Sequence, residues 1–417
     1  MGLGPDGTPT PEQNIEKRPS SASPRRRFLV GAVAAVGGTV GIAAWASRNK
    51  VDDTQVTAST QTAIIKITPA NGTTDAGVTD ASVTCIKGEL TDVTLVAVDN
   101  PTPVRGSLSA DKKTWKPDSP LERGTAYKVT AKAKDLQERA LTQRAAFTTV
   151  SAANSFIGTF TPEDASTVGV GMPVSLTFDK PVKDKRAVES ALKVTSSSGQ
   201  HVVGHWFSDT RIDFRPKEYW EAGSTVTLRL RLAGIEAAPG IKGIQDKTVS
   251  FTIGRSQIST VDVGRHTMTV VRGGKTIKVI PISAGSTKTP TYNGQMVISE
   301  KHKETRMDGS TVGFGGEYDI PDVPHAMRLS TSGTFIHGNY WSKGVFGTSN
   351  TSHGCIGLAD TQGANNPQTT GAWFYANSLI GDIVIVKDSP DETIRPDNGL
   401  NAWNMHWNDW VKGSALS

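Results

Sequence analysis

The sequence predicts a mainly β protein with two tandem β-sandwiches, a third β-rich domain and a short helical tail. The 417 residues are too many for one compact core and suit about three domains. Apolar residues make up 36% of the chain, and 42 Gly and 22 Pro interrupt it often, which favours short strands joined by turns over long helices. A sequence pattern also occurs twice in the first half of the chain, which indicates tandem domains.

Charge and cysteine content exclude several classes of protein. Lys and Arg number 45 against 40 Asp and Glu, and this net charge of +5 is spread along the chain without a basic stripe. We therefore expect no nucleic-acid partner. The chain has two cysteines, Cys85 and Cys355, which are too few for a disulfide framework or for a cluster of cysteine ligands around zinc. We expect neither a metal nor a cofactor.

The N-terminal segment has the composition of an export signal. Residues 1–27 are polar and end on a basic run, so we expect a disordered stretch that carries a twin-arginine motif. The apolar segment 28–46 has Gly or Ala at ten of its 19 positions, which is weak for a membrane-spanning helix. Residues 47–60 are interpreted as a linker.

Two interpretations of the apolar segment place the rest of the chain outside the cytoplasmic membrane. In the first, a twin-arginine signal is cleaved after the small-x-small sequence Ala44-Trp45-Ala46. In the second, the segment stays uncut as a signal anchor. The expected location is the cell wall or periplasmic space, and the protein contacts the membrane only through this segment if it is uncut.

A repeated pattern divides the next part of the chain into two modules, 61–152 and 153–254. Each copy carries an aromatic-x-Pro segment, a Gly, an alternating strand and a closing Phe-Thr, and Trp115 and Phe214 lie 99 positions apart. Short alternating strands separated by turn residues predict β-sandwiches of about 100 residues each. The pattern resembles the bacterial immunoglobulin-like modules found before wall-modifying catalytic domains.

These modules carry no catalytic pattern. Cys85 alternates with its neighbours like a buried strand residue, so we interpret it as a small apolar core residue. His201 and His205 have a ligand spacing for a helix, but Gly204 and β-branched neighbours place them on or beside a strand. Strand geometry holds positions four apart too far from each other to share a metal.

The third domain, residues 255–390, is also predicted to be rich in strands. A Gly-Gly turn at 273–274 predicts a hairpin. The expected strands are 258–263, 267–271, 276–280 and 296–299, with a short helix at 371–379 and a final strand at 381–386.

The tail, residues 391–417, is rich in tryptophan. Trp403, Trp407 and Trp410 are spaced to share one face of a helix. We expect this stripe to pack on the molecule's own surface, with sugar stacking or partner docking as the alternative.

The residues with the greatest chemical potential lie between His337 and Cys355. The thiolate is the reactive form of cysteine, so a catalytic thiol needs a base, and both His337 and His353 are candidates. Gly354 permits a tight turn, which is expected to expose the sulfur and to aim backbone N–H groups at one point as an oxyanion hole. The alternative is that Cys355 is a second buried structural cysteine.

This segment resembles the motif of a known family. His337-Gly338, then a loop, then Ser-His-Gly-Cys at 352–355 is similar to the motif of the L,D-transpeptidases, the YkuD-type catalytic domain. The resemblance covers roughly residues 256–390 and implies a mostly β, sandwich-like fold with a short helix. The two immunoglobulin-like modules and the Trp-rich tail are similar to the layout of the actinobacterial members.

The resemblance implies a role for each residue of the motif. Cys355 is the nucleophile, and His337 is the general base, its ring oriented by a backbone carbonyl near Gly338. His353 lies beside the sulfur and supports the thiolate, and the backbone N–H groups of Gly354 and Cys355, with His353, form the oxyanion hole. The substrate-binding positions implied are Tyr318, as a lid residue, and Ser332, Gly333, Gly338, Ser352 and Gly357.

Gly357 departs from the family pattern. The family usually has Arg or Asn at this position, where the side chain helps to hold the donor peptide. Only a backbone contact is possible from Gly357, so the preference for the donor is expected to differ.

The resemblance also implies the reaction. Cys355 forms a thioester with a tetrapeptide stem of peptidoglycan and releases D-alanine, and the amine of an acceptor stem then resolves the thioester into a 3→3 cross-link. Carbapenem-type β-lactams are expected to acylate the same sulfur, and no cofactor takes part. Two alternatives remain: an L,D-carboxypeptidase in which water is the acceptor, and a wall-binding protein with an inactive catalytic domain.

Overall fold

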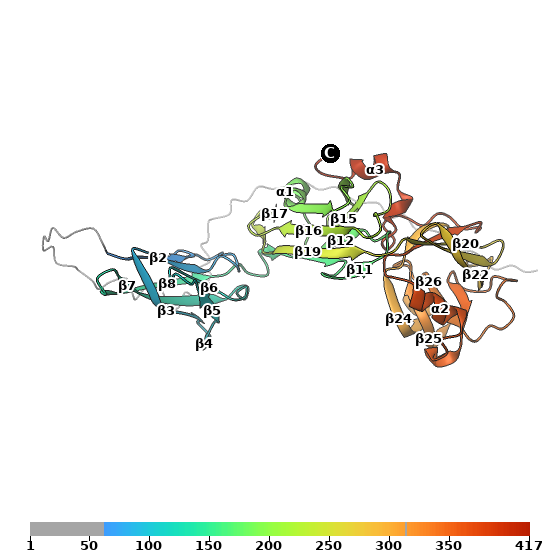
Figure 1. Cartoon of the computed structure of the whole chain (residues 1–417), viewed down its shortest axis with the longest axis horizontal. Coiled ribbons are helices and arrows are strands. Elements are labelled where there is room, and N and C mark those ends of the chain that lie inside the picture. Colours follow the sequence, from blue (N-terminus) through green and yellow to red (C-terminus); the bar gives the residue numbers. More distant parts are fainter. Residues whose placement is uncertain (1–61, 313–314) are drawn as a thin grey trace, which may run out of the picture. The chain divides into compact units, whose positions relative to one another are not determined.

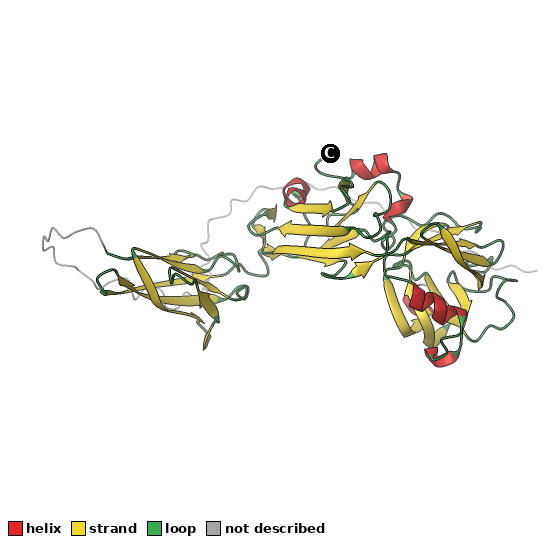
Figure 2. Ribbon diagram, in the orientation of Figure 1, coloured by secondary structure: helices red, strands yellow, loops and turns green. Residues whose placement is uncertain are grey.

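The protein is built mainly from β-strands, as the sequence predicts (Figures 1 and 2). The computed structural model describes residues 62–312 and 315–417. The expected twin-arginine motif, the apolar segment 28–46 and the linker 47–60 lie outside the described residues. Within those described ranges, no helix is long and apolar enough to cross a membrane.

The first sandwich packs two four-stranded sheets, ordered β1-β2-β6-β5 and β4-β3-β7-β8. Cys85 lies on β2 in the core between them, beside Leu90 and Trp115, so the prediction of a buried core residue is confirmed. The strands are β1 (Ile64–Thr68), β2 (Ser82–Ile86), β3 (Gly88–Ala97), β4 (Asn100–Pro103), β5 (Gly106–Leu108), β6 (Thr114–Pro117), β7 (Ala126–Asp135) and β8 (Ala140–Thr148).

The second sandwich has sheets ordered β10-β12-β15-β14 and β11-β19-β16-β13, with a small sheet β17-β18-β9 at one edge. The aromatic-x-Pro segments of the two modules lie on corresponding strands, β6 and β15. The elements are β9 (Ser155–Phe156), β10 (Gly158–Thr161), β11 (Thr167–Val168), β12 (Val174–Phe178), α1 (Lys185–Ser190), β13 (Leu192–Ser196), β14 (Val202–Trp206), β15 (Arg211–Pro216), β16 (Thr225–Arg231), β17 (Glu236–Ala238), β18 (Ile241–Gly243) and β19 (Asp246–Ile253).

The third domain is organised around a nine-stranded sheet of order β23-β28-β20-β21-β22-β27-β26-β25-β24, with α2 against β25, β26 and β27. Gly273 and Gly274 both have positive φ, as the expected hairpin requires. The elements are β20 (Gln257–Asp262), β21 (Thr267–Arg272), β22 (Lys275–Ser283), β23 (Gly294–Val297), β24 (Glu300–Asp308), η1 (Gly309–Val312), β25 (Asp319–Arg328), β26 (Phe335–Asn339), β27 (Ile356–Ala359), η2 (Gln362–Ala364), α2 (Thr370–Asn377) and β28 (Ile383–Lys387).

The tail consists of two short helices, η3 (Ala402–Asn404) and α3 (Trp407–Lys412). The prediction of one helical stripe is therefore wrong, because extended backbone at Met405 separates Trp403 from the other two tryptophans. All three rings nevertheless surround one cation, with centroids 4.8, 5.4 and 4.4 Å from the guanidinium carbon of Arg215. The prediction that the tryptophans pack on the molecule's own surface is confirmed.

The tail attaches the third domain to the second sandwich. The indole N–H of Trp403 donates to the carbonyl of Gly171 at 2.7 Å, and that of Trp410 donates to Val203 at 2.9 Å. The His205 ring stacks on Trp410 at 4.8 Å between centroids. Val297, Ile383 and Trp403 join the core of the second sandwich, so the two domains share buried apolar surface.

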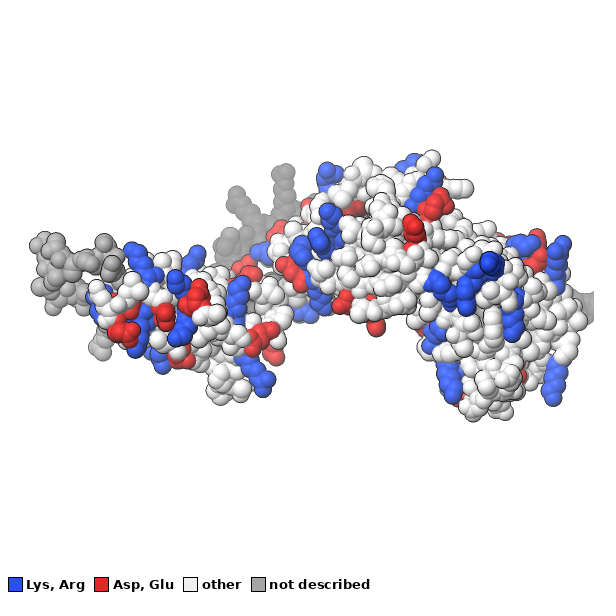
Figure 3. All heavy atoms as spheres, viewed as in Figure 1, with Lys and Arg blue, Asp and Glu red and all other residues white. Residues whose placement is uncertain are grey.

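Charge is distributed differently on the domains. On the face in Figure 3, Lys and Arg are interspersed with Asp and Glu over the first sandwich, whereas Lys and Arg predominate over the third domain. An anionic ligand is therefore favoured electrostatically on that face of the third domain.

The Trp410 side chain is predicted to contribute much of the stability of the attachment between the tail and the second sandwich. Trp410 is completely buried, so Trp410→Ala is expected to lower the free energy of unfolding by about 3–5 kcal/mol through lost burial and a residual cavity. Guanidinium unfolding followed by tryptophan fluorescence measures the change. Trp407→Ala is the matched control, because Trp407 is only partly buried and its loss is expected to cost less. Equal losses in the two variants would contradict this packing role.

Candidate active site

Cys355 lies immediately before β27 and is largely buried. Its residue surface is 9% exposed, and it packs against Val323, Ala326 and Phe335 from β25 and β26. The thiol donates to the carbonyl oxygen of Gly333, with Sγ 3.6 Å from that oxygen. The expectation that the Gly354 turn exposes the sulfur is wrong, because the two neighbouring strands cover it.

Burial also controls the protonation of this cysteine. It raises the pKa of the Cys355 thiol to about 11, although the backbone N–H of Phe335 acts in the opposite direction. The resting side chain is therefore a neutral thiol at pH 7.

The parallel pairing of β26 with β27 brings His337 to the cysteine. His337 is in register with Gly357, two residues after Cys355, and both His337 and Cys355 line one pocket. The ring nitrogen Nδ1 lies 2.8 Å from the carbonyl oxygen of Gly338, the orienting contact expected for this histidine. A carbonyl only accepts, so Nδ1 carries the hydrogen and Nε2 keeps its lone pair for a proton.

The pKa of His337 is lowered by burial, while the Gly338 carbonyl and the charge of Asp360 oppose the shift. Asp360 was not a candidate from the sequence. Its fully buried carboxylate is 2.7 Å from Nδ1 of His325, and a Cβ on Gly338 would overlap it. The negative charge of Asp360 therefore lies next to Gly338, the residue whose carbonyl orients the His337 ring. No sequence signal pointed to it, because Asp360 and His325 are 35 positions apart.

His353 lies at the rim of the same pocket. Its Nε2 is 2.9 Å from a carboxylate oxygen of Glu317, and its ring centroid is 5.1 Å from that of Tyr318. The structure gives contacts of the His353 ring with Glu317 and Tyr318. The role of His353 beside the sulfur stays a prediction. Burial raises the pKa of Tyr318 to about 12, and negative charge on Cys355 and Asp308 adds to the shift.

The turn before β27 leaves two backbone N–H groups without a hydrogen-bond partner among the described residues. Gly354 has a φ of 104°, a conformation that favours glycine. The hydroxyl of Ser352 donates to the carbonyl of Cys355 at 2.5 Å and holds the turn. Among the described residues, neither Gly354 nor Cys355 uses its backbone N–H in a hydrogen bond, so both donors can stabilise an oxyanion.

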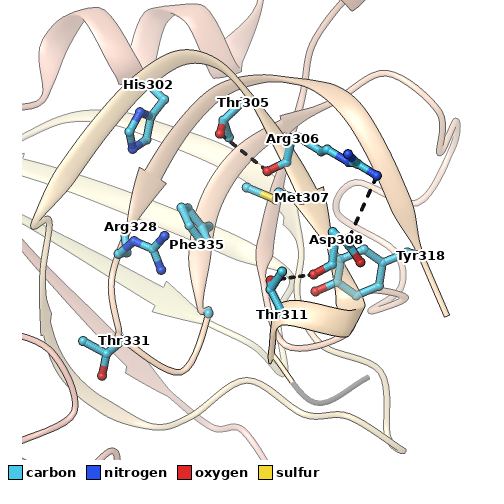
Figure 4. A pocket seen from close by; sticks show the side chains of 11 residues that line it. His302, Thr305, Arg306, Met307, Asp308, Thr311, Tyr318, Arg328, Thr331 and Phe335 are labelled. Atoms are coloured by element: carbon cyan, nitrogen blue, oxygen red, sulfur yellow. Dashed lines mark hydrogen bonds and ion pairs between the residues drawn. The ribbon is translucent and has the colours of Figure 1, made fainter. Parts of the chain in front are cut away.

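Two pockets lie near Cys355, and two lining residues are common to both. The smaller, about 160 Å³, is lined by Cys355 itself. The larger, about 250 Å³, lies around Phe335 and Tyr318 (Figure 4) and is also lined by Gly333, whose carbonyl accepts the thiol hydrogen bond. Met307 and Tyr318 line both pockets, so these two side chains belong to the walls of each. The role of Tyr318 as a lid residue stays a prediction.

The other predicted substrate positions differ in their surroundings. Gly333 lines the larger pocket and Ser352 the smaller one. Ser332 lines neither, because its hydroxyl accepts a hydrogen bond of 2.8 Å from the side chain of Asn398. Gly338 faces Asp360 and contributes its carbonyl to His337.

Asn339 occupies the space beside Gly357 and was also missed from the sequence. A Cβ on Gly357 would lie 3.5 Å from Nδ2 of Asn339, on the neighbouring strand. The Asn339 side chain is buried and lines the smaller pocket, and its Oδ1 accepts from the backbone N–H groups of Trp341 and Ser342. Within the described ranges Nδ2 has no hydrogen-bond partner. The Asn339 amide is therefore an available donor beside Gly357, which has no side chain to donate a hydrogen bond.

Comparison with known proteins assigns both parts of the chain. The model of the bacterial Ig domain matches residues 73–236, and that of the L,D-transpeptidase catalytic domain (YkuD) matches residues 256–386. Fold and matches together define a modular transpeptidase, in which immunoglobulin-like domains precede a catalytic domain.

Similar proteins extend over nearly the whole chain. L,D-transpeptidase 2 of Mycobacterium tuberculosis is 33% identical over 415 residues, which cover 90% of this chain and 99% of the relative. L,D-transpeptidase 5 of the same species is 32% identical, covering 75% of this chain and 68% of the relative. A solved structure of the L,D-transpeptidase LdtMt1 in complex with imipenem is 28% identical with a TM-score of 0.46, covering 55% of this chain and 97% of that one. The chain belongs to the L,D-transpeptidase family.

The raised pKa of Cys355 predicts how its reactivity depends on pH. Alkylation by iodoacetamide requires the thiolate, so the rate at Cys355 is expected to be low at pH 7 and to rise from pH 9 through about 11. Peptide mapping by mass spectrometry follows Cys355 separately from Cys85. A rate that reaches its plateau below pH 8 would contradict a neutral resting thiol.

Proposed function

We propose that this protein is a peptidoglycan L,D-transpeptidase that forms 3→3 cross-links between stem peptides through a thioester on Cys355 and releases D-alanine. The observation that carries the proposal is the placement of Cys355 and His337 in one pocket, with a second pocket that shares Met307 and Tyr318 with it. Export by the twin-arginine route to the cell wall, where the protein remodels peptidoglycan, is part of the same proposal.

In the acylation step, the Cys355 thiol turns from the carbonyl of Gly333 to His337. Nε2 of His337 takes the proton as the sulfur attacks the carbonyl between the third and fourth stem residues. The backbone N–H groups of Gly354 and Cys355, assisted by His353, stabilise the tetrahedral oxyanion. His337 then gives the proton to the amine of D-alanine, which leaves as the thioester forms.

In the second step, the amine of an acceptor stem attacks the thioester carbonyl. His337 takes a proton from this amine, the new amide bond forms, and the sulfur leaves and recovers a proton as the thiol. The charge of Asp360 stabilises the imidazolium form of His337 that exists during both steps. The two pockets support this scheme because donor and acceptor need separate binding sites, and Tyr318 lines both pockets.

A carboxypeptidase is the second candidate and uses the same residues, with water in place of the acceptor amine. The larger pocket favours the transpeptidase, since a water molecule needs no binding pocket of about 250 Å³. β-Lactams are proposed to acylate the same sulfur, and the complex of the relative LdtMt1 with imipenem supports this. The remaining alternative, an inactive wall-binding protein, predicts no acylation.

The first test is covalent labelling of the cysteine. After incubation with imipenem, intact-mass spectrometry is expected to find one adduct on the wild-type chain and on Cys85→Ala, and none on Cys355→Ala. Incubation with a disaccharide-tetrapeptide is expected to give cross-linked dimers and free D-alanine. Tripeptide monomers without dimers would rule out the transferase, and a Cys355→Ala adduct would rule out the nucleophile.

The second test concerns Asn339. Asn339→Ala removes the amide, and Asn339→Asp keeps the oxygen that holds Trp341 and Ser342 but loses the Nδ2 donor. Both are expected to lower kcat/KM for D-alanine release by about 2- to 12-fold, the range for one neutral hydrogen bond. Adding Gly357→Asn to Asn339→Ala returns an amide to the same space and is expected to recover activity. Wild-type activity in Asn339→Asp would rule out a donor role.

A further inference from the structure

A buried histidine and a buried carboxylate form a pair beside Gly338, the residue whose carbonyl orients His337. His325 belongs to β25 and Asp360 directly follows β27, and Nδ1 of His325 is 2.7 Å from Oδ2 of Asp360. The two side chains are 7% and 0% exposed. Neither side chain lines either of the two pockets, so an effect of the pair on the reaction has to pass through His337 and Gly338.

The Asp360 carboxylate is held in place by three hydrogen bonds. Oδ1 accepts from the backbone N–H of Thr361 at 2.8 Å and from the hydroxyl of Thr369 at 2.7 Å. A carboxylate only accepts, so His325 donates to Oδ2 from Nδ1. Donors from three different parts of the chain therefore fix this group in one position.

The carboxylate lies against the backbone of Gly338. A Cβ on Gly338, or one on Gly371 of α2, would be 2.2 Å from Oδ2 of Asp360, so both glycines leave room for this oxygen. The backbone N–H of Asp360 also donates to the carbonyl of Asn339 at 3.3 Å. The carboxylate is thus packed on the residue that follows His337 in β26, and its charge acts on the pKa of that histidine.

His325 reaches this position through an unusual backbone conformation. Strand β25 pairs with β26 through Met327 and Ile336, and the same register continued by two positions places His325 opposite Gly338. The φ of His325 is 50°, which residues other than glycine adopt rarely and only where surrounding contacts enforce it. Its ring packs against that of Tyr375 from α2, with 5.1 Å between the centroids. Packing between β25 and α2 therefore sets where this imidazole lies.

Other ionisable groups near His337 have different surroundings. The thiol in the same pocket is neutral at pH 7, and the rim carries the contact between Glu317 and His353. Asp322 on β25 accepts a hydrogen bond of 2.6 Å from the tyrosine three positions after His337. Of these three carboxylates, that of Asp360 is the one whose charge acts on the pKa of His337.

We propose that His325 and Asp360 form a positioning pair for His337. His325 holds the carboxylate against Gly338, and the negative charge makes the neighbouring imidazole a stronger base for the thiol proton. The inference rests on the proposed transpeptidase function. It adds His325, a buried side chain that the reaction scheme does not use, as a residue on which the strength of the base depends.

The direct test measures the pKa of His337 in the full chain by NMR with carbon-labelled histidine, and His337→Gln assigns the signal. In Asp360→Asn, loss of the charge is expected to lower this pKa by about one unit, the lower end of the range for a nearby opposite charge. Asp322→Asn is the matched control, because it makes the same change in a carboxylate outside the pair and is expected to leave the pKa of His337 unchanged. An unchanged value in Asp360→Asn overturns the proposal.

The pH dependence of D-alanine release separates the effect of charge from a structural effect. His337 accepts a proton only when its ring is neutral, so the acid limb of kcat/KM reports its pKa. In Asp360→Asn this limb is expected to move to lower pH by about one unit, and kcat to fall by up to about 10-fold because the base is weaker. A lower kcat at every pH with an unmoved limb overturns the proposal. If the wild type releases no D-alanine but the NMR shift is present, the pair stands and the proposed transpeptidase function is overturned.

Two variants of His325 test the pair without changing its charge. His325→Ala removes the Nδ1 donor, so the carboxylate is no longer held against Gly338 and the pKa of His337 is expected to fall, by less than in Asp360→Asn. His325→Asn is expected to restore the wild-type value, because its amide can donate and asparagine tolerates a left-handed backbone. Equal pKa values of His337 in His325→Ala and the wild type overturn the role of His325, also if Asp360→Asn does not fold.

Discussion

The parallel pairing of β26 with β27 is the constraint on which the site depends. It joins two strands separated by a long loop and aligns His337 with Gly357, so that a thiol and an imidazole 18 positions apart face one pocket. The pairing also requires room on both sides. The Asp360 carboxylate fills the volume that a side chain on Gly338 would need, and the Asn339 side chain lies in the space beside Gly357. Small residues at these points are thus a consequence of packing as well as of chemistry.

Burial controls the chemistry of the pair. It raises the pKa of Cys355 and lowers that of His337, so it favours the neutral form of both side chains. These shifts also link stability to pH. The contribution of Cys355 is complete below its unfolded pKa near 9 and is lost as pH rises through about 11, whereas that of His337 is present above pH 6.5 and is lost as pH falls below it.

The domains are coupled by the chain's last residues. Arg215 of the second sandwich is surrounded by three tail tryptophans, and Trp403 also bonds to Gly171. Since Ile383 of β28 enters the same core, the sheet that carries the active-site strands is anchored at one end to the immunoglobulin-like module. The module therefore serves as a support for the third domain.

The sequence alone determined the β architecture and identified Cys355 and His337 as the candidate pair. Alternating strands with Gly and Pro turns are local signals, and the Ser-His-Gly-Cys motif is contiguous, so both could be found without coordinates. The burial of Cys355, the separation of the tryptophans into two helices, and the positions of Asp360 and Asn339 were decided only by tertiary structure. Each depends on side chains far apart in the chain that meet across neighbouring strands, and no local pattern encodes such contacts.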